Sequence, residues 1–281
     1  MTGAGTKGAN PAAMLVIATL SAVILIWSTP LIWMAIASFR PQNFGGLDMA
    51  SLWPDFSPTW ANFAEALDSA EFPLLYLNTA IVCAGTLGVQ LVTVTLAGYA
   101  FARLRFPGKE LLFYAFLLQL MLVPPILIVP NLVTITRLGL YDSLLGVMVP
   151  YFASAFGVFL MRQTFKTIPR DFEEAAIVDG ATWWQLVWRV LVPLARPGMI
   201  AFAIVSVVSH WNEFLWPLMV ISSPDNQTLT IGLASFTMGA ESASQWGVMA
   251  AGTFLVVAPL LAAFALFQRQ FVNSFLFSGV K

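Results

Sequence analysis

His210 and Glu213 are the side chains of this sequence best suited to acid–base or hydrogen-bonding chemistry, because both interrupt a long apolar run. They stand three residues apart, so a continuous helix would place both on one face. An ionisable group at membrane depth costs on the order of 2.5–3.5 kcal/mol and usually faces a cavity or a partner. With its neighbours the pair forms a polar and aromatic cluster that suits a passage for a hydroxylated solute, with tryptophans as stacking surfaces: His210, Trp211, Asn212, Glu213 and Trp216.

Two other interpretations of this cluster stay open. Glu213 and Asn212 could pair with another helix or subunit, with Trp216 as an anchor at the membrane interface. Alternatively, His210 and Glu213 could be the acid and base of an intramembrane enzyme, although the sequence offers no nucleophile beside them. His210 is the only histidine, which excludes His-rich metal sites and most catalytic triads. We therefore predict no catalytic residue and no metal site in this chain.

A second stretch with informative spacing is the charged interruption at 169–197, between two long apolar runs. Asp171, with Glu174 three residues later, predicts a capped helix start. Gly180 predicts the end of that helix, because glycine adopts the left-handed cap conformation at low cost. This first helix presents paired carboxylates, Glu173 and Glu174, beside two small alanines, and so predicts a contact surface.

A second short helix is expected directly after Gly180. Thr182 with Gln185 at the third position is a capping box, and prolines at 193 and 197 bound the helix. Its apolar residues fall on one face, as in a helix that lies along a membrane surface: Trp184, Val187, Trp188 and Leu191.

The composition limits the class of protein. Of 281 residues, 59% are hydrophobic and 10% charged, and the mean hydropathy is +0.81, which predicts an integral membrane protein. A net charge of −1 argues against nucleic acid as a partner, since its phosphates need a basic surface. Gly108 and Lys109 are the nearest approach to a phosphate-binding loop, but the required spacing is missing. The chain is therefore not expected to hydrolyse nucleotide.

Six stretches reach the roughly 20 residues that a membrane-spanning helix needs. They predict an all-α membrane protein with a single transmembrane domain over 1–281. The third stretch contains Pro124, Pro125 and Pro130, which predict a kink or a break that lines a cavity. The expected spans are 14–37, 76–101, 111–134, 144–165, 198–221 and 246–267.

The positions of lysine and arginine predict the orientation of the spans. Eleven of the 13 basic residues lie in the N-terminal tail, the second-to-third connection, the fourth-to-fifth connection or the C-terminus. Only Arg40 and Arg137 lie on the other side, where the long loop from Phe39 to Leu75 carries several acids. Because cytoplasmic loops are enriched in basic residues, both termini and the 169–197 segment are expected in the cytoplasm.

The 169–197 segment resembles the EAA loop of the permease subunits of ABC importers. The pattern of that loop is Glu-Ala-Ala, three residues, Gly, nine residues, then Ile-x-Leu-Pro. The present chain has Glu174-Ala175-Ala176, Gly180 and Val190 to Pro193, and departs only in the valines at 190 and 192. The resemblance implies a segment that couples the chain to an ATPase: Glu173, Glu174, Ala175, Ala176, Asp179 and Gly180.

The resemblance also implies partners and a location. These are a second, usually non-identical, permease subunit, two ATP-binding cassette subunits and an external solute-binding protein. The chain would bind no cofactor itself, since ATP and Mg²⁺ would be used by the cassette subunits. The location implied is the prokaryotic cytoplasmic (inner) membrane, which the chain crosses several times.

A motif in the fifth apolar stretch narrows the resemblance to one subgroup of these permeases. Trp211 to Leu218 looks like the signature of the carbohydrate-importing subgroup, to which the shorter permease of maltose importers belongs. The ending at Gly279-Val280-Lys281 is similar to that subgroup, whereas Phe275 to Ser278 departs from it. The implied substrate is a sugar or an oligosaccharide. A glycerol-phosphate ester or another polar solute is the alternative, because related permeases with similar motifs import such solutes.

Overall fold

The structure is a computed structural model that describes residues 11–41, 58–69, 71–239 and 246–279, and these residues form helices and connections with no strand among them. The predicted all-helical class is therefore confirmed. Parts of two predictions lie outside the described residues. These parts are 42–57 of the expected outer loop, and Lys7 and Lys281 of the basic residues used for orientation.

Three helices are long and apolar enough to cross a membrane, and up to six spans result if each of three bent helix pairs counts as one. The three single helices are α1 (Pro11–Ser38), α3 (Phe72–Arg103) and α14 (Trp246–Gly279). The first bent pair joins α4 (Lys109–Met121) to η2 (Pro124–Leu127) and α5 (Ile128–Arg137) at 106°. The second joins α6 (Leu144–Met148) and η3 (Val149–Tyr151) to α7 (Ala155–Thr167) at 45°.

The third bent pair contains the second helical part of the 169–197 segment. It joins α9 (Trp183–Gln185), the π-helical turn η4 (Leu186–Leu191) and α10 (Val192–Leu194) to α11 (Arg196–Trp211) at 77°. The remaining elements are α2 (Ala61–Ser69), α8 (Asp171–Val178), α12 (Leu215–Val220), η5 (Pro224–Asn226) and α13 (Leu229–Gly239).

The chain divides into two compact units, one of residues 1–70 and 236–257 and the other of residues 71–235 and 258–281. In the first unit, the buried amide of Asn62 donates to the carbonyls of Ser38 at 2.9 Å and Arg40 at 2.6 Å. Phe63 packs its ring against Phe254 of α14. These contacts join α2 to the end of α1 and to the start of α14.

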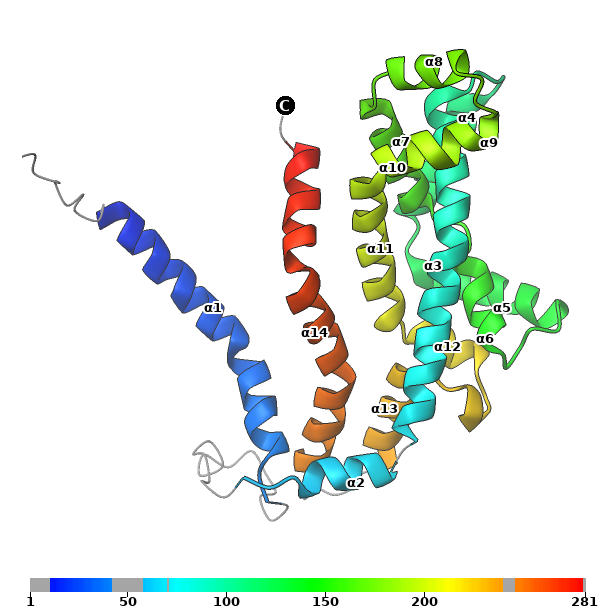
Figure 1. The fold of residues 1–281 in the computed structure, drawn as a ribbon. Coiled ribbons are helices and arrows are strands. Elements are labelled where there is room, and N and C mark those ends of the chain that lie inside the picture. The colour runs from blue at the N-terminus through cyan, green and yellow to red at the C-terminus, as the bar shows by residue number, and fades with distance from the viewer. Residues whose placement is uncertain (1–10, 42–57, 70, 240–245, 280–281) are drawn as a thin grey trace, which may run out of the picture. The chain divides into compact units, whose positions relative to one another are not determined.

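The second unit is built around α3, which packs along α7 and α11 (Figure 1). Small residues allow this close approach, since a Cβ on Gly98 would lie 2.6 Å from the Cβ of Met161. A Cβ on Gly157 would likewise meet Val94 and Phe202 at 2.6 Å. α8, α9 and α10 lie at the C-terminal end of α3, where the core continues into η4 (Figure 1).

Three of the predicted spans are not single helices, namely 111–134, 144–165 and 198–221, and only the break in the first of them was expected. The stretch 111–134 breaks after Met121, because Pro124 and Pro125 cannot donate a backbone hydrogen bond and restrict the residue before them. The stretch 198–221 breaks between Trp211 and Leu215. The prolines of the third stretch do form a break, as expected.

Candidate functional site

Pro217 explains why the fifth stretch breaks at Glu213. A proline lacks a backbone N–H, and its ring clashes with the carbonyl four residues earlier, which here belongs to Glu213. The freed Glu213 carbonyl accepts a hydrogen bond from the hydroxyl of Thr230 at 2.7 Å. The expectation that His210 and Glu213 share one continuous helical face was therefore wrong, since α11 ends at Trp211 and Glu213 lies in the break.

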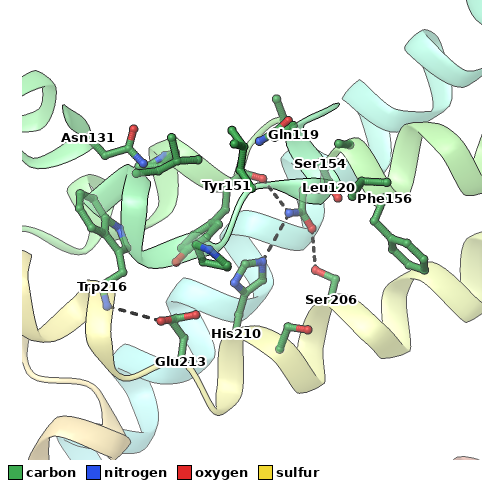
Figure 2. A pocket seen from close by; sticks show the side chains of 18 of the residues that line it. Gln119, Leu120, Asn131, Tyr151, Ser154, Phe156, Ser206, His210, Glu213 and Trp216 are labelled. Carbon is green, nitrogen blue, oxygen red and sulfur yellow. Dashed lines mark hydrogen bonds between the residues drawn. The ribbon is translucent and has the colours of Figure 1, made fainter. Parts of the chain in front are cut away.

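Three breaks in the helices meet around one cavity of about 470 Å³ in the second unit (Figure 2). They are the proline-rich break between α4 and α5, the break between η3 and α7, and the break between α11 and α12. Helices that stop here expose backbone and side-chain polar groups that a continuous helix would cover. The polar side chains of the lining are Gln90, Gln119, Asn131, Tyr151, Ser154, Ser206, Ser209, His210 and Glu213.

Gln90 of α3 is the centre of the polar network in this cavity. Its amide nitrogen donates to the carbonyl of Tyr151 at 2.7 Å and lies 3.4 Å from Nε2 of His210. Its amide oxygen accepts from the hydroxyl of Ser206 at 2.6 Å. Gln90 is buried, and Figure 2 shows Tyr151, Ser206 and His210 around this network. One side chain thus joins α3, the η3–α7 break and α11.

His210, Glu213 and Trp216 all line the cavity, but they present different surfaces. The ring of Tyr151 packs on His210 with centroids 4.6 Å apart, and the Glu213 carboxylate interacts with the phenol of Tyr151. Trp216 is 3% exposed and donates through its indole nitrogen to the carbonyl of Val147 at 3.1 Å. Trp216 is therefore packed into the wall of the cavity. The expectation that it offers an open stacking face was wrong.

The other two residues of the predicted cluster lie outside the cavity lining. Trp211 packs its ring near Tyr76, with centroids 6.4 Å apart. Asn212 is exposed and donates back to the carbonyl of Val208. Trp211 is the last residue of α11 and Asn212 is its C-cap, so both keep helical positions that lie outside the cavity lining.

The helix ends of the predicted coupling segment follow the sequence closely. Gly180 has a φ of +80°, and its N–H donates to Ile177, while the N–H of Ala181 donates to Ala176 at 2.9 Å. These two hydrogen bonds form a Schellman motif, which ends α8 as predicted. Thr182 and Gln185 form the predicted capping box at the start of α9.

Two details of this segment differ from the prediction. Asp171 is the first helical residue and makes no cap, because α8 begins directly from Arg170 in helical backbone geometry. Val187 and Leu191 are fully buried in the core with α3 and α7, so the face that contains them does not lie along a membrane surface. Only Trp184 of that face is well exposed, at 58%.

The candidate coupling residues divide into exposed and buried groups. Glu174, Ala175, Asp179 and Gly180 are exposed, and Ala176 is half-buried. Glu173 instead turns inward, where its carboxylate lies 2.6 Å from Nε of Arg103 with both side chains largely covered. α8 also exposes three apolar side chains that the sequence analysis did not select: Phe172, Ile177 and Val178.

Three residues that matter for these two sites were missed in the sequence. Gln90 is a polar residue inside the apolar stretch 76–101, which is the signal that could have identified it. Tyr151 follows Pro150 in a stretch expected to be a plain span. Arg103 belongs to a group of basic residues that, taken as a group, predicts only the orientation of the chain.

Known proteins resemble this chain over most of its length. Diacetylchitobiose uptake system permease protein NgcG of Streptomyces coelicolor is 31% identical over 259 residues, which cover 90% of this chain and 85% of the relative. The sn-glycerol-3-phosphate transport system permease protein UgpE of Yersinia enterocolitica is 33% identical, with 79% of each chain covered. The lactose transport system permease protein LacG of Rhizobium radiobacter is 32% identical, with 76% and 78% covered.

The fold is also similar to that of solved structures. A chain of a bacterial ABC transporter involved in the import of the acidic polysaccharide alginate superposes with a TM-score of 0.79, at 21% identity and with 95% and 99% of the two chains covered. A chain of a bacterial alginate ABC transporter in complex with an alginate pentasaccharide-bound periplasmic protein superposes with a TM-score of 0.64, at 14% identity. Because both identities are low, these similarities show a shared fold and nothing about the solute.

A family match assigns the chain. Residues 94–274 match the family described as "Binding-protein-dependent transport system inner membrane component". This match includes the cavity lining except Gln90, the 169–197 segment and the break at Glu213, and it confirms the resemblance drawn from the EAA pattern. It also confirms that the chain is not itself an enzyme. The chain therefore belongs to the family of inner membrane components of binding-protein-dependent transport systems, and it is a permease subunit of such an ATP-driven importer.

Proposed function

We propose that this permease imports a neutral sugar or oligosaccharide through the cavity around Gln90, driven by separate ATPase subunits that bind α8. The proposed assembly contains a second, non-identical permease subunit, two ATP-binding cassette subunits and an external solute-binding protein. ATP and Mg²⁺ are used by the cassette subunits. The chain crosses the inner membrane six times, with both termini and the 169–197 segment in the cytoplasm.

The observation that carries the coupling role is the exposed surface of α8. Gly180 ends α8 in a Schellman motif and Thr182 caps the start of α9 directly after it, so local motifs fix the turn that follows this surface. Glu174 with its exposed alanine provides an acid beside a small side chain, and Phe172, Ile177 and Val178 add apolar area. An apolar surface bordered by charged side chains, here the exposed acids Asp171, Glu174 and Asp179, is typical of a protein–protein contact.

The side chains that line the cavity favour binding of a neutral hydroxylated solute over binding of a phosphate ester. Its lining combines amides, hydroxyls, one imidazole and one carboxylate, which can exchange hydrogen bonds with sugar hydroxyls. Among the residues that the structure describes, no lysine or arginine lines this cavity, whereas phosphate groups are usually bound by such residues. The carboxylate of Glu213 would also repel a phosphate.

A glycerol-phosphate ester is the second candidate, because UgpE is among the similar relatives. Reconstituted complex with its binding protein should take up labelled diacetylchitobiose or lactose in preference to sn-glycerol 3-phosphate. Faster ATP-dependent uptake of sn-glycerol 3-phosphate than of either sugar would overturn the neutral-sugar assignment.

Substitutions in α8 test the coupling role. Glu174→Lys and Gly180→Trp should leave the protein inserted but reduce ATPase binding and solute uptake by at least about tenfold, since each changes the contact surface. Asp68→Lys makes the same charge change at an exposed acid of α2 and serves as the control. Normal assembly with normal uptake in both α8 variants would contradict the proposal.

Glu213 tests the role of the cavity. Glu213→Ala should lower uptake about tenfold or more while the complex is recovered intact, because a hydrogen-bond partner of the solute in the cavity lining is lost. Asn212→Ala, at the neighbouring exposed residue, should have little effect. Failure to recover intact complex with Glu213→Ala would instead assign Glu213 a structural role.

A further inference from the structure

The C-terminal end of α3 is attached to the coupling segment by Arg103. Its Nε lies 2.6 Å from the carboxylate of Glu173, and its terminal nitrogen donates to the carbonyl of Ile168 at 2.5 Å. The side chains of Arg103 and Glu173 are 8% and 13% exposed. A covered ion pair is costly to separate, because each charge would lose its partner in a poorly hydrated place. α8 is therefore tied to the last residue of α3.

The middle of the same helix is attached to the cavity by Gln90. This side chain holds the Tyr151 carbonyl, the Ser206 hydroxyl and the imidazole of His210, which belong to the η3–α7 break and to α11. Displacement of α3 along its axis would pull on all three contacts. Gln90 therefore connects α3 to two walls of the cavity.

Between these attachments α3 is a regular helix. Arg103 lies thirteen positions after Gln90, which is about 20 Å at the rise of an α-helix. No proline interrupts the helix between them. Gly98 lets α3 approach the backbone of α7 closely, so the two helices are expected to move together. A helix supported in this way transmits displacement with little bending.

We propose that α3 is a lever that carries movement of α8 to the cavity, with Arg103 and Gln90 as the positioning residues at its two attachments. This inference rests on the proposed function, in which ATPase subunits move α8. The lever would transmit movement from α8 to the cavity through side-chain contacts between helices, and not along the covalent chain. The covalent route runs from α8 through α10 into α11 and leaves Arg103 unused.

A reporter cysteine makes movement at the cavity measurable without knowledge of the solute. Cys83 is the only cysteine and is buried, so Cys83→Ala gives a cysteine-free background. Ala153 is exposed and lines the cavity, and Ala153→Cys in that background introduces the reporter. The complete complex in proteoliposomes is treated with a membrane-impermeant maleimide, with and without ATP and Mg²⁺, and the rate of modification is measured.

Charge exchange at the ion pair is the main test. Arg103→Glu and Glu173→Arg should each reduce the ATP-dependent change in modification rate about tenfold, within the usual range of coupling between sites. The double exchange should restore the change to within about threefold. Arg105→Glu reverses an exposed charge two residues away and should leave the change as in the parent. ATP hydrolysis by each recovered complex shows that the ATPase subunits remain bound and active.

Gln90 is tested at the other attachment. Gln90→Leu keeps the size of the side chain and removes its hydrogen bonds, so it should also abolish the ATP-dependent change while hydrolysis continues. Gln163→Leu is the matched control, because Gln163 is exposed on α7 and is not among the cavity-lining residues. Equal loss with Gln163→Leu would overturn the role of Gln90.

The remaining outcomes distinguish failure of the α3 lever from failure of the proposed import function. An ATP-dependent change that persists in both single charge variants would overturn the lever, since the covalent route would then suffice. Loss that the double exchange fails to restore, or that Arg105→Glu reproduces, would also overturn it. No ATP-dependent change in the parent reporter protein would overturn the proposed function itself.

Discussion

Asp142 joins two connections of the chain through its side chain and its backbone. Its carboxylate accepts hydrogen bonds from the hydroxyl and N–H of Ser223 and from the N–H of Ser222. Its own N–H donates to Val220, and its carbonyl accepts from Asn226. The residue has a φ of +57°, which acidic and amide side chains tolerate better than most. These contacts hold the connection before α6 against the one after α12.

The hydrogen bonds from Ser223, together with the N–H of Ser222, lower the pKa of Asp142 below its ordinary value. A lowered folded-state pKa means that the stabilisation is present above the unfolded pKa, about 3.9, and is lost as the pH falls through the folded pKa. Asp142→Asn keeps the backbone geometry and should lower the unfolding temperature by a constant amount from pH 7 to about pH 4. Tryptophan fluorescence of purified protein measures this difference, and a gap that already closes between pH 7 and pH 5 would contradict the assignment.

At the scale of elements, helix breaks shape the cavity. Proline residues end α4 and force the interruption between α11 and α12, and each break frees backbone groups that need new partners. At Glu213 the new partner is the hydroxyl of Thr230, at the start of α13. The α11–α12 break is thus held by a side chain from a later helix.

Thr230→Val tests this arrangement, because it preserves the shape of the side chain and removes the donor. The Glu213 carbonyl would be left without its partner, so we expect a loss of about 1–3 kcal/mol in stability, together with reduced uptake. Thr253→Val is the control, since the hydroxyl of Thr253 only bonds back to Met249 within α14. Denaturant unfolding measured by circular dichroism should separate the two variants, and equal stabilities would refute the role of Thr230.

At the scale of the molecule, close packing of α3 and α7 organises the second unit. Gly98 faces the backbone of α7, whereas Gly88 on the same helix has open space where a Cβ would lie. The two glycines therefore differ in what they contribute to the packing of α3. Only Gly98 is needed for the contact between the helices.

Gly98→Ala should destabilise the protein by about 1–3 kcal/mol, because the added methyl group overlaps Met161 and pushes the helices apart. Gly88→Ala should be neutral or stabilising by about 0.4–1 kcal/mol, since alanine restricts the unfolded chain. Unfolding in detergent compares the two variants directly. A Gly98→Ala protein as stable as the Gly88→Ala protein would show that the α3–α7 contact is not tight.

Much of this protein could be predicted from residues that are close in the sequence. The apolar stretches predicted a helical membrane protein, and Glu174 to Pro193 predicted the family. Gly180 and the Thr182–Gln185 box set the helix ends of the coupling segment as expected, because capping depends on a few neighbouring residues. These features need no knowledge of the rest of the fold.

Tertiary structure alone decided which polar side chains meet. Gln90 reaches Ser206 and His210 across sequence separations of 116 and 120 residues, and Arg103 reaches Glu173 from another helix. It also decided that His210 and Glu213 line the cavity while Trp211 and Asn212 lie outside it. The physical reason is that a helix end is specified by local backbone geometry, whereas a cavity is formed by the packing of helices that are distant in the chain.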